Sequence, residues 1–550
     1  MARQSKPSKR TPGRQRKTER KTSVKSPVRK ALVRKALVRK ALVRKAVAKA
    51  SARKAAPVNR ASSRRATAGA DGAGASVRIR FYCQGIGDCH LLRFAKPDGG
   101  AFWMLIDCGI HSSVTGGTAT IKAVVDDIWK LTERLDVIVL THEHWDHNSG
   151  FYLAPDEFKP FDVGEVWLGW TENAADPQAR ELDKFKGAAL KALQGASQRL
   201  ERAPGLSSYL ANVRQGLHAV QEFNFGAKGE KVRAARNAAM KLASSDKVRF
   251  LEPKDVPFEL PVAPGIRVYV LGPPRDKSLI GVTDRPGETY GINRFGLAPI
   301  VLGLNNAFDS GGDPCNDETA PFDPNEGFDL SDILAGTAPA QLTNEDERKS
   351  RAHTLDLIHD RYTDASGEPW RRIDHDWLGV SADLAIQIDQ RTNNSSLVLA
   401  FEFLDTGRVM LFVGDAQVGN WLSWKDVHWP IGDKTVTAHD LLARTVFYKV
   451  GHHGSHNATL KQNGLELMTS PDLAAFIPTN AADAKKVGWG EMPFEPLLDD
   501  LRKRTSQRVV RADDPWLKQP QETPKIATGA IKKVSHDPSG GGLWVEFEIG

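Results

Sequence analysis

The stretch THEHWDHNSG, Thr141 to Gly150, places three histidines and two acids within six positions. His142, His144, Asp146 and His147 have the spacing His-x-His-x-Asp-His. Neutral imidazole and carboxylate groups suit a borderline or hard divalent ion, and one short loop of this kind presents two ligands to one ion and two to a neighbour. The alternative is a polar turn with packed or solvated side chains, which is how we interpret Glu143. Three histidines and an aspartate at this spacing favour metal binding.

The elements before this loop indicate how it is positioned. A run that alternates apolar and polar residues, two further apolar runs and a short buried run predict strands, and one amphipathic segment predicts a helix. The predicted strands are residues 77–84, 91–95, 102–109 and 136–140, the predicted turn is 85–90, and the predicted helix is Ile121 to Leu135. Strands and a helix in this order favour an α/β fold, in which sites lie at the carboxyl ends of strands.

The N-terminal segment differs in composition from the rest of the chain. Residues 1–70 contain 24 Lys and Arg and one acid, so they carry +23, and because the whole chain carries +9 the remaining 480 residues carry −14. A five-residue unit, VRKAL, repeats from Val28 and leaves no persistent apolar face on a helix. We predict that residues 1–75 form a disordered arm.

Closely spaced lysine and arginine release counterions from a nucleic acid without reading its sequence, so the arm indicates nucleic acid as a partner. A solubilising leader and a transit peptide are the alternatives, the latter because the arm is rich in Arg, Ser and Ala.

The remaining composition restricts the class of protein. Apolar residues make up 40% of the chain, enough for a sizeable core. No apolar run reaches the roughly 18 residues of a membrane span. The four cysteines form no Cys-x-x-Cys pair, which argues against a disulfide framework and a thiolate zinc site. A reducing, cytoplasmic location is the default expectation, and the oligomeric state is not indicated.

Four stretches follow one another along the chain in this order: Asp107-Cys-Gly109, THEHWDHNSG, LFVGDAQ (411–417) and KVGHHGSHN (449–457). Together they resemble the metallo-β-lactamase fold superfamily. The phrases GIGDCHLLRF, NNSSLVLAF and VGHHGS further resemble the metallo-hydrolase domain of bacterial DNA-uptake competence proteins. The resemblance covers roughly residues 77–510. It implies an αββα sandwich, two sheets faced by helices, within a domain spanning residues 76–550.

The resemblance also implies a site for two divalent ions, zinc or manganese. In it, His142 and His144 hold the first ion and Asp146 and His147 the second, while Asp415 bridges the two ions and His452 completes the second. A bridging hydroxide formed near neutral pH would attack the substrate.

Other residues would support this chemistry. Asp107 would orient one of the ligands from beneath. Asp146 and His453 are the candidate catalytic residues. His453 and Ser455 are also candidates to meet the substrate or protonate a leaving group; the alternative is that they only shape a loop.

One expected ligand is missing. The superfamily usually supplies another histidine to the first ion before the bridging aspartate, and this chain has the phrase Asn393-Asn-Ser-Ser396 at that place. Either Asn393, with Ser396 nearby, replaces the histidine, or an inserted histidine reaches in. The inserted histidines are His218, His353, His359 and His375. A weaker oxygen ligand would make manganese as suitable as zinc.

Two insertions interrupt the resemblance, a helical one at about residues 155–245 and a loop-rich one at about residues 276–390. They leave the substrate open. The first hypothesis is a metal-dependent phosphodiesterase or nuclease, because the arm and the competence-like phrases agree. The second is a hydrolase of small lactones, esters or cyclic nucleotides, and the third is a nucleic-acid-binding protein with a vestigial metal site.

Overall fold

The structure is a computed structural model that describes the chain from residue 76 onward. Residues 203–205, 207, 224–229, 254, 262, 264, 283, 284, 286, 290–329, 363–375, 487–489 and 520–525 are also outside the description. The arm predicted at residues 1–75 and much of the insertion predicted at 276–390 therefore lie outside the described residues. All described elements belong to the unit that spans residues 72–550.

Two large sheets form the centre of this unit. The first has the strand order β16-β17-β1-β2-β3-β4-β5-β6, and the second has the order β15-β14-β13-β10-β9-β8-β7. The strands of the first sheet are β1 (Val77–Tyr82), β2 (Cys89–Ala95), β3 (Ala101–Cys108), β4 (Arg134–Leu140), β5 (Asp162–Gly169), β6 (Val248–Leu251), β16 (Ile531–His536) and β17 (Trp544–Ile549). Those of the second are β7 (Phe258–Glu259), β8 (Ile266–Gly272), β9 (Val398–Phe403), β10 (Val409–Phe412), β13 (Thr445–Lys449), β14 (Ala474–Ile477) and β15 (Val509–Arg511). A separate hairpin pairs β11 (His428–Ile431) with β12 (Lys434–Thr437).

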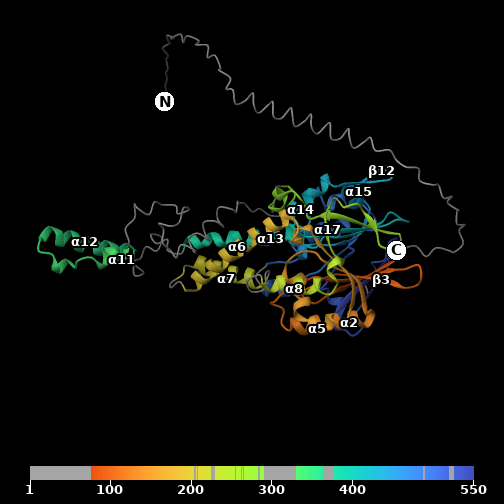
Figure 1. Cartoon of the computed structure of the whole chain (residues 1–550), viewed down its shortest axis with the longest axis horizontal. Coiled ribbons are helices and arrows are strands. Elements are labelled where there is room, and N and C mark those ends of the chain that lie inside the picture. Colours follow the sequence, from red (N-terminus) through yellow and green to blue (C-terminus); the bar gives the residue numbers. More distant parts are fainter. Residues whose placement is uncertain are drawn as a thin grey trace, which may run out of the picture. The chain divides into compact units, whose positions relative to one another are not determined.

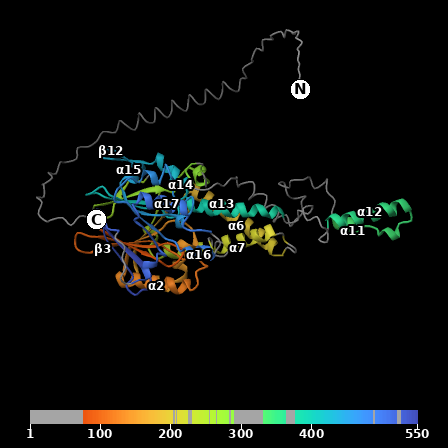
Figure 2. The same cartoon turned by 180° about the vertical axis from the view of Figure 1, so that it is seen from behind.

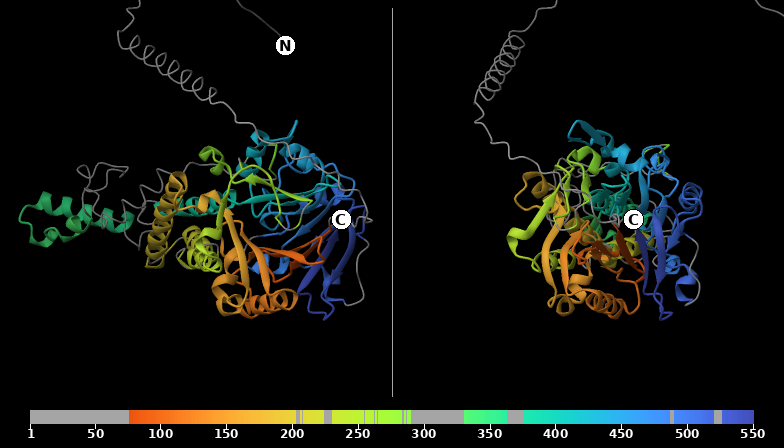
Figure 3. Two further views of the ribbon diagram at one scale, coloured as in Figure 1. Left: turned by 45° about the vertical axis from the view of Figure 1, so that its right-hand side comes forward. Right: turned by 90° about the vertical axis from the view of Figure 1, so that its right-hand side faces the viewer.

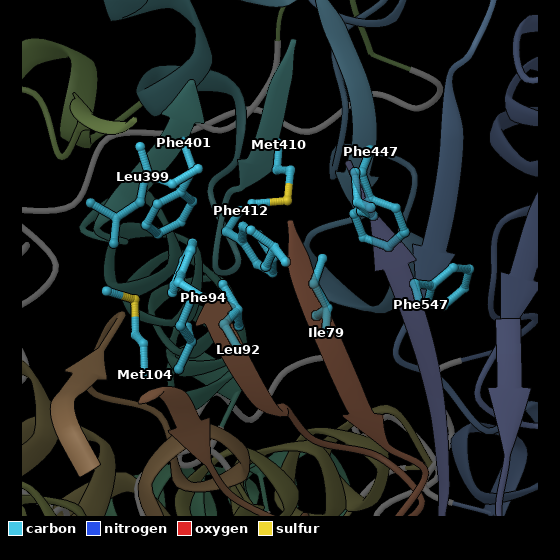
Figure 4. Packing of buried hydrophobic residues seen from close by; sticks show 14 of the residues in the cluster. Ile79, Leu92, Phe94, Met104, Leu399, Phe401, Met410, Phe412, Phe447 and Phe547 are labelled. Atoms are coloured by element: carbon cyan, nitrogen blue, oxygen red, sulfur yellow. The ribbon is translucent and has the colours of Figure 1, made fainter. Parts of the chain in front are cut away.

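The main core lies between the two sheets. Figure 4 shows Leu92 and Phe94 of the first sheet facing Phe401 and Phe412 of the second. All four side chains are buried, and burying one such side chain contributes about 1.5–3 kcal/mol. This packing fixes the two sheets face to face, because a shift of one residue in any strand would turn its apolar side chains away from the core.

Helices cover the outer face of each sheet (Figure 1, Figure 2, Figure 3). One cluster packs the first sheet against α2 (Gly117–Leu131), α4 (Gly150–Leu153), α5 (Pro155–Phe158) and α8 (Glu230–Met240). Another packs the second sheet against α14 (Val418–Ser423), α15 (Ala438–Ala443) and α17 (Glu495–Arg504). Helix, sheet, sheet and helix follow one another, so the predicted α/β sandwich is confirmed.

A further apolar cluster consists of helices without any strand. It joins α6 (Pro177–Arg202), α7 (Ser208–Phe223) and α13 (Val380–Asn394) through buried leucine, alanine and isoleucine side chains. The remaining helices are α3 (Trp145–Asn148), α9 (Lys277–Ile280), α11 (Leu330–Ala335), α12 (Glu345–Tyr362) and α16 (Ala481–Lys486). Among the described residues, no helix has the length and apolar character needed to cross a membrane.

Two local predictions differ from the structure. The helix predicted at Ile121 to Leu135 runs from Gly117 to Leu131, because Thr132 leaves the helical conformation and Leu135 already belongs to β4. The predicted turn at residues 85–90 is shorter, because Cys89 and His90 pair with β3 and belong to β2.

Parallel pairing brings the ends of several strands together. In the first sheet β3, β4, β5 and β6 are parallel neighbours, and in the second β10, β13, β14 and β15 are. The carboxyl ends of parallel strands meet at one edge of a sheet. The sequence singled out residues at these ends: Asp107 near the end of β3, and the residues that follow β4, β10 and β13.

Candidate metal centre

The loop after β4 is held against the end of β3 by one carboxylate. Asp107 accepts hydrogen bonds from the backbone N–H of Thr141 at 2.8 Å and from the Thr141 hydroxyl at 2.6 Å. Nδ1 of His147 lies 2.8 Å from Oδ2 of Asp107, the oxygen that also accepts from the Thr141 hydroxyl. Asp107 has a positive φ of 54°, which is uncommon for a non-glycine residue and is found mainly where surrounding structure enforces it. Asp107 therefore holds both the start of the loop and the ring of His147.

A glycine allows this loop to approach the end of β3. A Cβ atom on Gly109 would collide with the backbone of Asp146 and with the backbone nitrogen of His147. The close approach sets the first turn of α3, which carries Asp146 and His147. Both side chains are buried.

Four side chains from both sheets converge at this edge. Ligand-type atoms of Asp146, His147, Asp415 and His453 all lie within 4.8 Å of one another. Nε2 of His453 is 2.9 Å from Asp146 and 3.9 Å from Asp415, and Nε2 of His147 is 3.1 Å from Asp415. Two carboxylates and two imidazoles at these distances form a donor set that suits a divalent ion.

Hydrogen bonds of His147 and His453 determine which nitrogen of each ring faces the other side chains of this group. Nδ1 of His453 lies 2.6 Å from the carbonyl oxygen of Pro478 and must donate to it. Nδ1 of His147 donates to Asp107 in the same way. Nε2 of each neutral ring then directs a lone pair at a carboxylate, an arrangement that requires either a proton on each Nε2 or a cation between the groups.

The pKa shifts of these four residues also indicate that the group can hold a cation. Burial disfavours charged histidine, yet the surrounding carboxylates together outweigh it and raise the pKa of both rings. Asp415 contributes most of this rise at His147, and the hydrogen bond with Asp146 contributes most at His453. Burial raises the pKa of both acids, but the neighbouring cationic groups, with His147 foremost, together outweigh it and lower the pKa of Asp146 and of Asp415. Buried carboxylates that attract protons to neighbouring imidazoles also attract a divalent cation, so these residues fit a metal ion.

His142 and His144 form a second, adjacent donor pair. Nε2 of His142 lies 3.0 Å from Nδ1 of His144. Burial lowers the pKa of His142 well below its usual value and lowers that of His144 to about 3. Both rings are therefore neutral at pH 7, and neutral imidazole is the form that binds a metal.

An acid that sequence reasoning missed lies beside this pair. Asp389 of α13 places a carboxylate oxygen 3.5 Å from Nε2 of His144. Asn393, one helical turn further along, has its Nδ2 3.4 Å from Asp389 and 3.3 Å from Nε2 of His452. The i, i+4 spacing of Asp389 and Asn393 places both on one helical face, and this spacing was a signal that the sequence offered.

The sequence analysis gave Asn393 and four inserted histidines as alternatives for the missing ligand. Asn393 is buried next to Asp389, which lies beside the pair His142 and His144. Ser396 accepts a hydrogen bond from the backbone N–H of Asp415 and so supports the loop after β10. His353 and His359 lie on α12 and are outside both groups of potential ligands found among the described residues. The side chain of His218 and the whole of His375 lie outside the description.

The two histidines after β13 have different surroundings. The sequence analysis gave the sixth ligand position to His452, but the ring that enters the four-residue group is that of His453. The backbone N–H of His452 donates to Asp415 at 2.8 Å, and its Nδ1 lies 2.9 Å from Gln417 and 2.5 Å from Ser455. His452 is half-buried, and burial lowers its pKa to about 4. His452, Ser455 and Gln417 thus form a network at the side of the group.

A buried lysine and a further aspartate join the two sheets beneath the group. Lys449, the last residue of β13, forms an ion pair with Asp88, donates to the carbonyl of Gly414 at 3.0 Å and lies 3.7 Å from Asp415. Asp88, Asp107 and His147 form the second group of potential ligands. Sequence reasoning missed both Asp88 and Lys449. A charged residue inside the apolar run TVFYKV was the available signal, since a buried lysine requires a partner.

Glu143 connects the His-x-His-x-Asp-His loop to the inserted helices. Its side chain is buried and forms ion pairs with Lys186 of α6 and Arg236 of α8, each at 2.7 Å. These two cations outweigh the effect of burial and lower the pKa of Glu143 to about 2. Glu143 is thus a packed side chain, and its ion pairs with Lys186 and Arg236 are contacts that the sequence analysis did not anticipate.

The comparison with known families agrees with this geometry. Residues 84–160 match the family model of the metallo-beta-lactamase superfamily. This range contains Asp88, Asp107 and the His-x-His-x-Asp-His loop. No curated protein matches the chain.

Proposed function

We propose that this protein is a metal-dependent hydrolase that cleaves phosphodiester bonds. The observation that carries the proposal is the convergence of Asp146, His147, Asp415 and His453 within 4.8 Å, beside the neutral pair His142 and His144. Two adjacent donor sets suit two divalent ions, and a pair of such ions is a recurring device for displacement at phosphorus. The superfamily match at residues 84–160 supports the same class of chemistry.

The proposed assignment of ligands differs from the sequence-based one at two places. Asp146, His147, Asp415 and His453 would hold one ion, with His453 in place of His452. His142 and His144 would hold the other, with Asp389 as the nearest acid and Asn393 next to it. Bound divalent ions would supply a hydroxide near neutral pH and would stabilise negative charge that develops on the attacked centre.

The chain's own residues would orient the reactants. Asp107 and the carbonyl of Pro478 hold the rings of His147 and His453, so that each Nε2 faces the group. His452 is uncharged at pH 7 and only half-buried, which suits a hydrogen bond with a substrate oxygen. The Ser455 hydroxyl, 2.5 Å from Nδ1 of His452, would keep that ring in place.

Nucleic acid is the proposed substrate because the first 70 residues carry +23. A cationic arm would raise the local concentration of a polyanion through counterion release. The net charge of −14 on residues 71–550 favours a second candidate, a hydrolase of small esters or cyclic nucleotides, because an acidic body repels a long polyanion.

Loss of one proposed ligand is expected to abolish turnover. Asp146→Ala should lower the hydrolysis of bis-p-nitrophenyl phosphate and of single-stranded DNA by more than about a hundredfold, since even groups behind metal ligands are worth about 10–100-fold. Both substrates are assayed with added manganese or zinc. Wild-type cleavage of lactones and esters without cleavage of either phosphodiester would favour the second candidate.

Removal of residues 1–70 separates the two candidates. A nuclease that uses the arm to recruit its substrate should lose activity on DNA at low salt, and the difference from the full chain should shrink as salt rises. Hydrolysis of bis-p-nitrophenyl phosphate is the matched control, because a small substrate needs no recruitment. Equal DNA cleavage by both chains at all salt concentrations would exclude a role for the arm in this reaction.

A further inference from the structure

A cavity of about 210 Å³ lies next to the metal centre, between the inserted helices and α13. Glu143 of the metal-binding loop, Lys186 of α6, Arg236 of α8 and Arg391 of α13 are among its lining residues. The volume is far above the roughly 10–15 Å³ that one water molecule requires. The cavity therefore has room for a small ligand as well as water.

The lining of this cavity is positively charged although the surrounding body is acidic. Five basic side chains, Arg180, Lys186, Arg233, Arg236 and Arg391, line it together with three acids, Glu143, Glu172 and Asp183. The lining thus carries +2, whereas residues 71–550 together carry −14. Such a local reversal of charge favours an anionic ligand.

The ion pairs of the lining account for three of the five cations. Lys186 and Arg236 pair with Glu143, Arg236 also pairs with Glu172, and Arg233 pairs with Asp183. Arg180 is exposed and donates to the carbonyl oxygens of Ala174 and Ala175.

Arg391 differs from the other four. Its Nε atom is buried without a hydrogen-bond partner, and within the described part of the chain no carboxylate pairs with its guanidinium. The centroid of the Phe185 ring lies 5.2 Å from its Cζ atom. Burial lowers the pKa of Arg391, with no carboxylate opposing the shift. A half-buried cation without a counter-ion is unfavourable in the absence of a ligand, and an arriving anion would remove that cost.

Helix α13 faces the cavity with one side and the candidate metal centre with another. Ile388, Arg391, Thr392 and Ser395 line the cavity and have the i, i+3, i+4, i+7 spacing of one helical face. Asp389, one residue away from Ile388, faces His144 instead. A ligand in the cavity would therefore lie beside the metal centre, with Glu143 at the boundary between them.

We propose that this cavity binds a phosphate-sized anion and that Arg391 is its principal cation. A planar guanidinium with free N–H groups suits two oxygen atoms of a phosphate, and Thr392 and Ser395 offer hydroxyl groups on the same helical face. The proposal deepens the proposed function and rests on it in one respect: the anion would be a phosphate of the substrate, adjacent to the bond that is cleaved.

Phosphate titration of the full chain tests the site. Isothermal titration calorimetry is performed with inorganic phosphate and with adenosine monophosphate, on protein as isolated and after chelation of metal ions. Wild type should keep one phosphate site after chelation. Arg391→Met should weaken this site by roughly tenfold or more, Arg391→Lys should restore part of the affinity, and Arg214→Met on the exposed surface of α7 should bind as wild type.

Thermal unfolding provides a readout that a structural role would not produce. Without phosphate, Arg391→Met should melt at the same temperature as wild type or higher, because it removes an unpaired cation while keeping a side chain of similar length. With phosphate, wild type and Arg214→Met should gain stability and Arg391→Met should not. If Arg391→Met failed to fold, Arg391→Lys with an intermediate affinity would carry the test.

The outcomes separate this inference from the proposed function. Phosphate binding that depends on Arg391, in a protein without hydrolase activity, would keep the site and overturn the proposed function. Hydrolase activity with equal phosphate affinity in wild type and Arg391→Met, or no phosphate site after chelation, would overturn the site alone. A tighter Kd for adenosine monophosphate than for phosphate would identify a substrate phosphate as the ligand, and equal Kd values a free phosphate.

Discussion

His453→Ala is expected to lower metal affinity by more than about a hundredfold and to reduce turnover accordingly, because it removes a proposed ligand, whereas loss of a group behind a ligand costs about 10–100-fold. The ring of His453 lies 2.9 Å from Asp146 and 3.9 Å from Asp415, and its Nδ1 is fixed by the carbonyl of Pro478. Metal content by mass spectrometry of the dialysed protein and turnover of bis-p-nitrophenyl phosphate are the measurements.

His452→Ala is the matched control for this prediction. The two residues are adjacent and have similar positive φ values, 45° and 52°, so alanine imposes a similar backbone cost at either position. His452→Ala should retain the metal content of wild type and change turnover only through its contacts with Gln417 and Ser455. The reverse pattern, metal lost in His452→Ala and kept in His453→Ala, would restore the sequence-based assignment.

Lys449→Met is expected to lower the free energy of unfolding by about 3–5 kcal/mol, the usual cost of removing one partner of a buried ion pair. Lys449 and Asp88 are both about 1% exposed, and their ion pair joins β13 of the second sheet to the segment before β2 of the first. Without the lysine, the charge of Asp88 stays buried beside His90 at 3.4 Å and His147 at 3.7 Å. Urea unfolding in the presence of a chelator, followed by circular dichroism, measures the change.

The double variant Asp88→Asn, Lys449→Met tests the cause. If the uncompensated carboxylate is responsible, removing it should recover more than half of the lost stability, because the two changes are coupled through one contact. Additive losses in the double variant would show instead that Lys449 acts through its hydrogen bond to Gly414.

Local patterns were sufficient to predict much of the fold and one side of the site. Buried strands such as β4 and β13 contain short apolar runs, and the His-x-His-x-Asp-His loop directly follows such a run. Asp107 lies near the end of the apolar strand β3, and Asp415 follows the apolar strand β10. Pattern and position agree at these places because parallel strands expose their carboxyl ends at one edge.

The rest of the site depends on contacts that the sequence does not encode locally. Asp88 and Lys449 meet only because the two sheets pack face to face, and Asp389 reaches His144 from a helix that follows a long insertion. The choice between His452 and His453 is decided by backbone conformation at two neighbouring residues with positive φ. Neighbouring identical residues carry no signal by which spacing alone could separate them.

The contacts of the inserted helices with the site also could not be predicted from the sequence. The helices α6 and α8 were predictable from their composition, but their role at the site follows from Lys186 and Arg236 reaching Glu143. An ion pair between a metal-binding loop and helices more than forty residues away is a property of packing. The cavity lined by Arg391 arises from the same packing.

The most direct test of the account is the number of metal ions bound by the purified full-length chain, measured by equilibrium dialysis against zinc or manganese for wild type beside Asp146→Ala. The account predicts two equivalents in wild type, one for each donor set, and a loss of at least one in the variant. Wild-type protein that binds no metal, or an Asp146→Ala variant that binds as much as wild type with equal affinity, would contradict a metal centre built on Asp146, His147, Asp415 and His453.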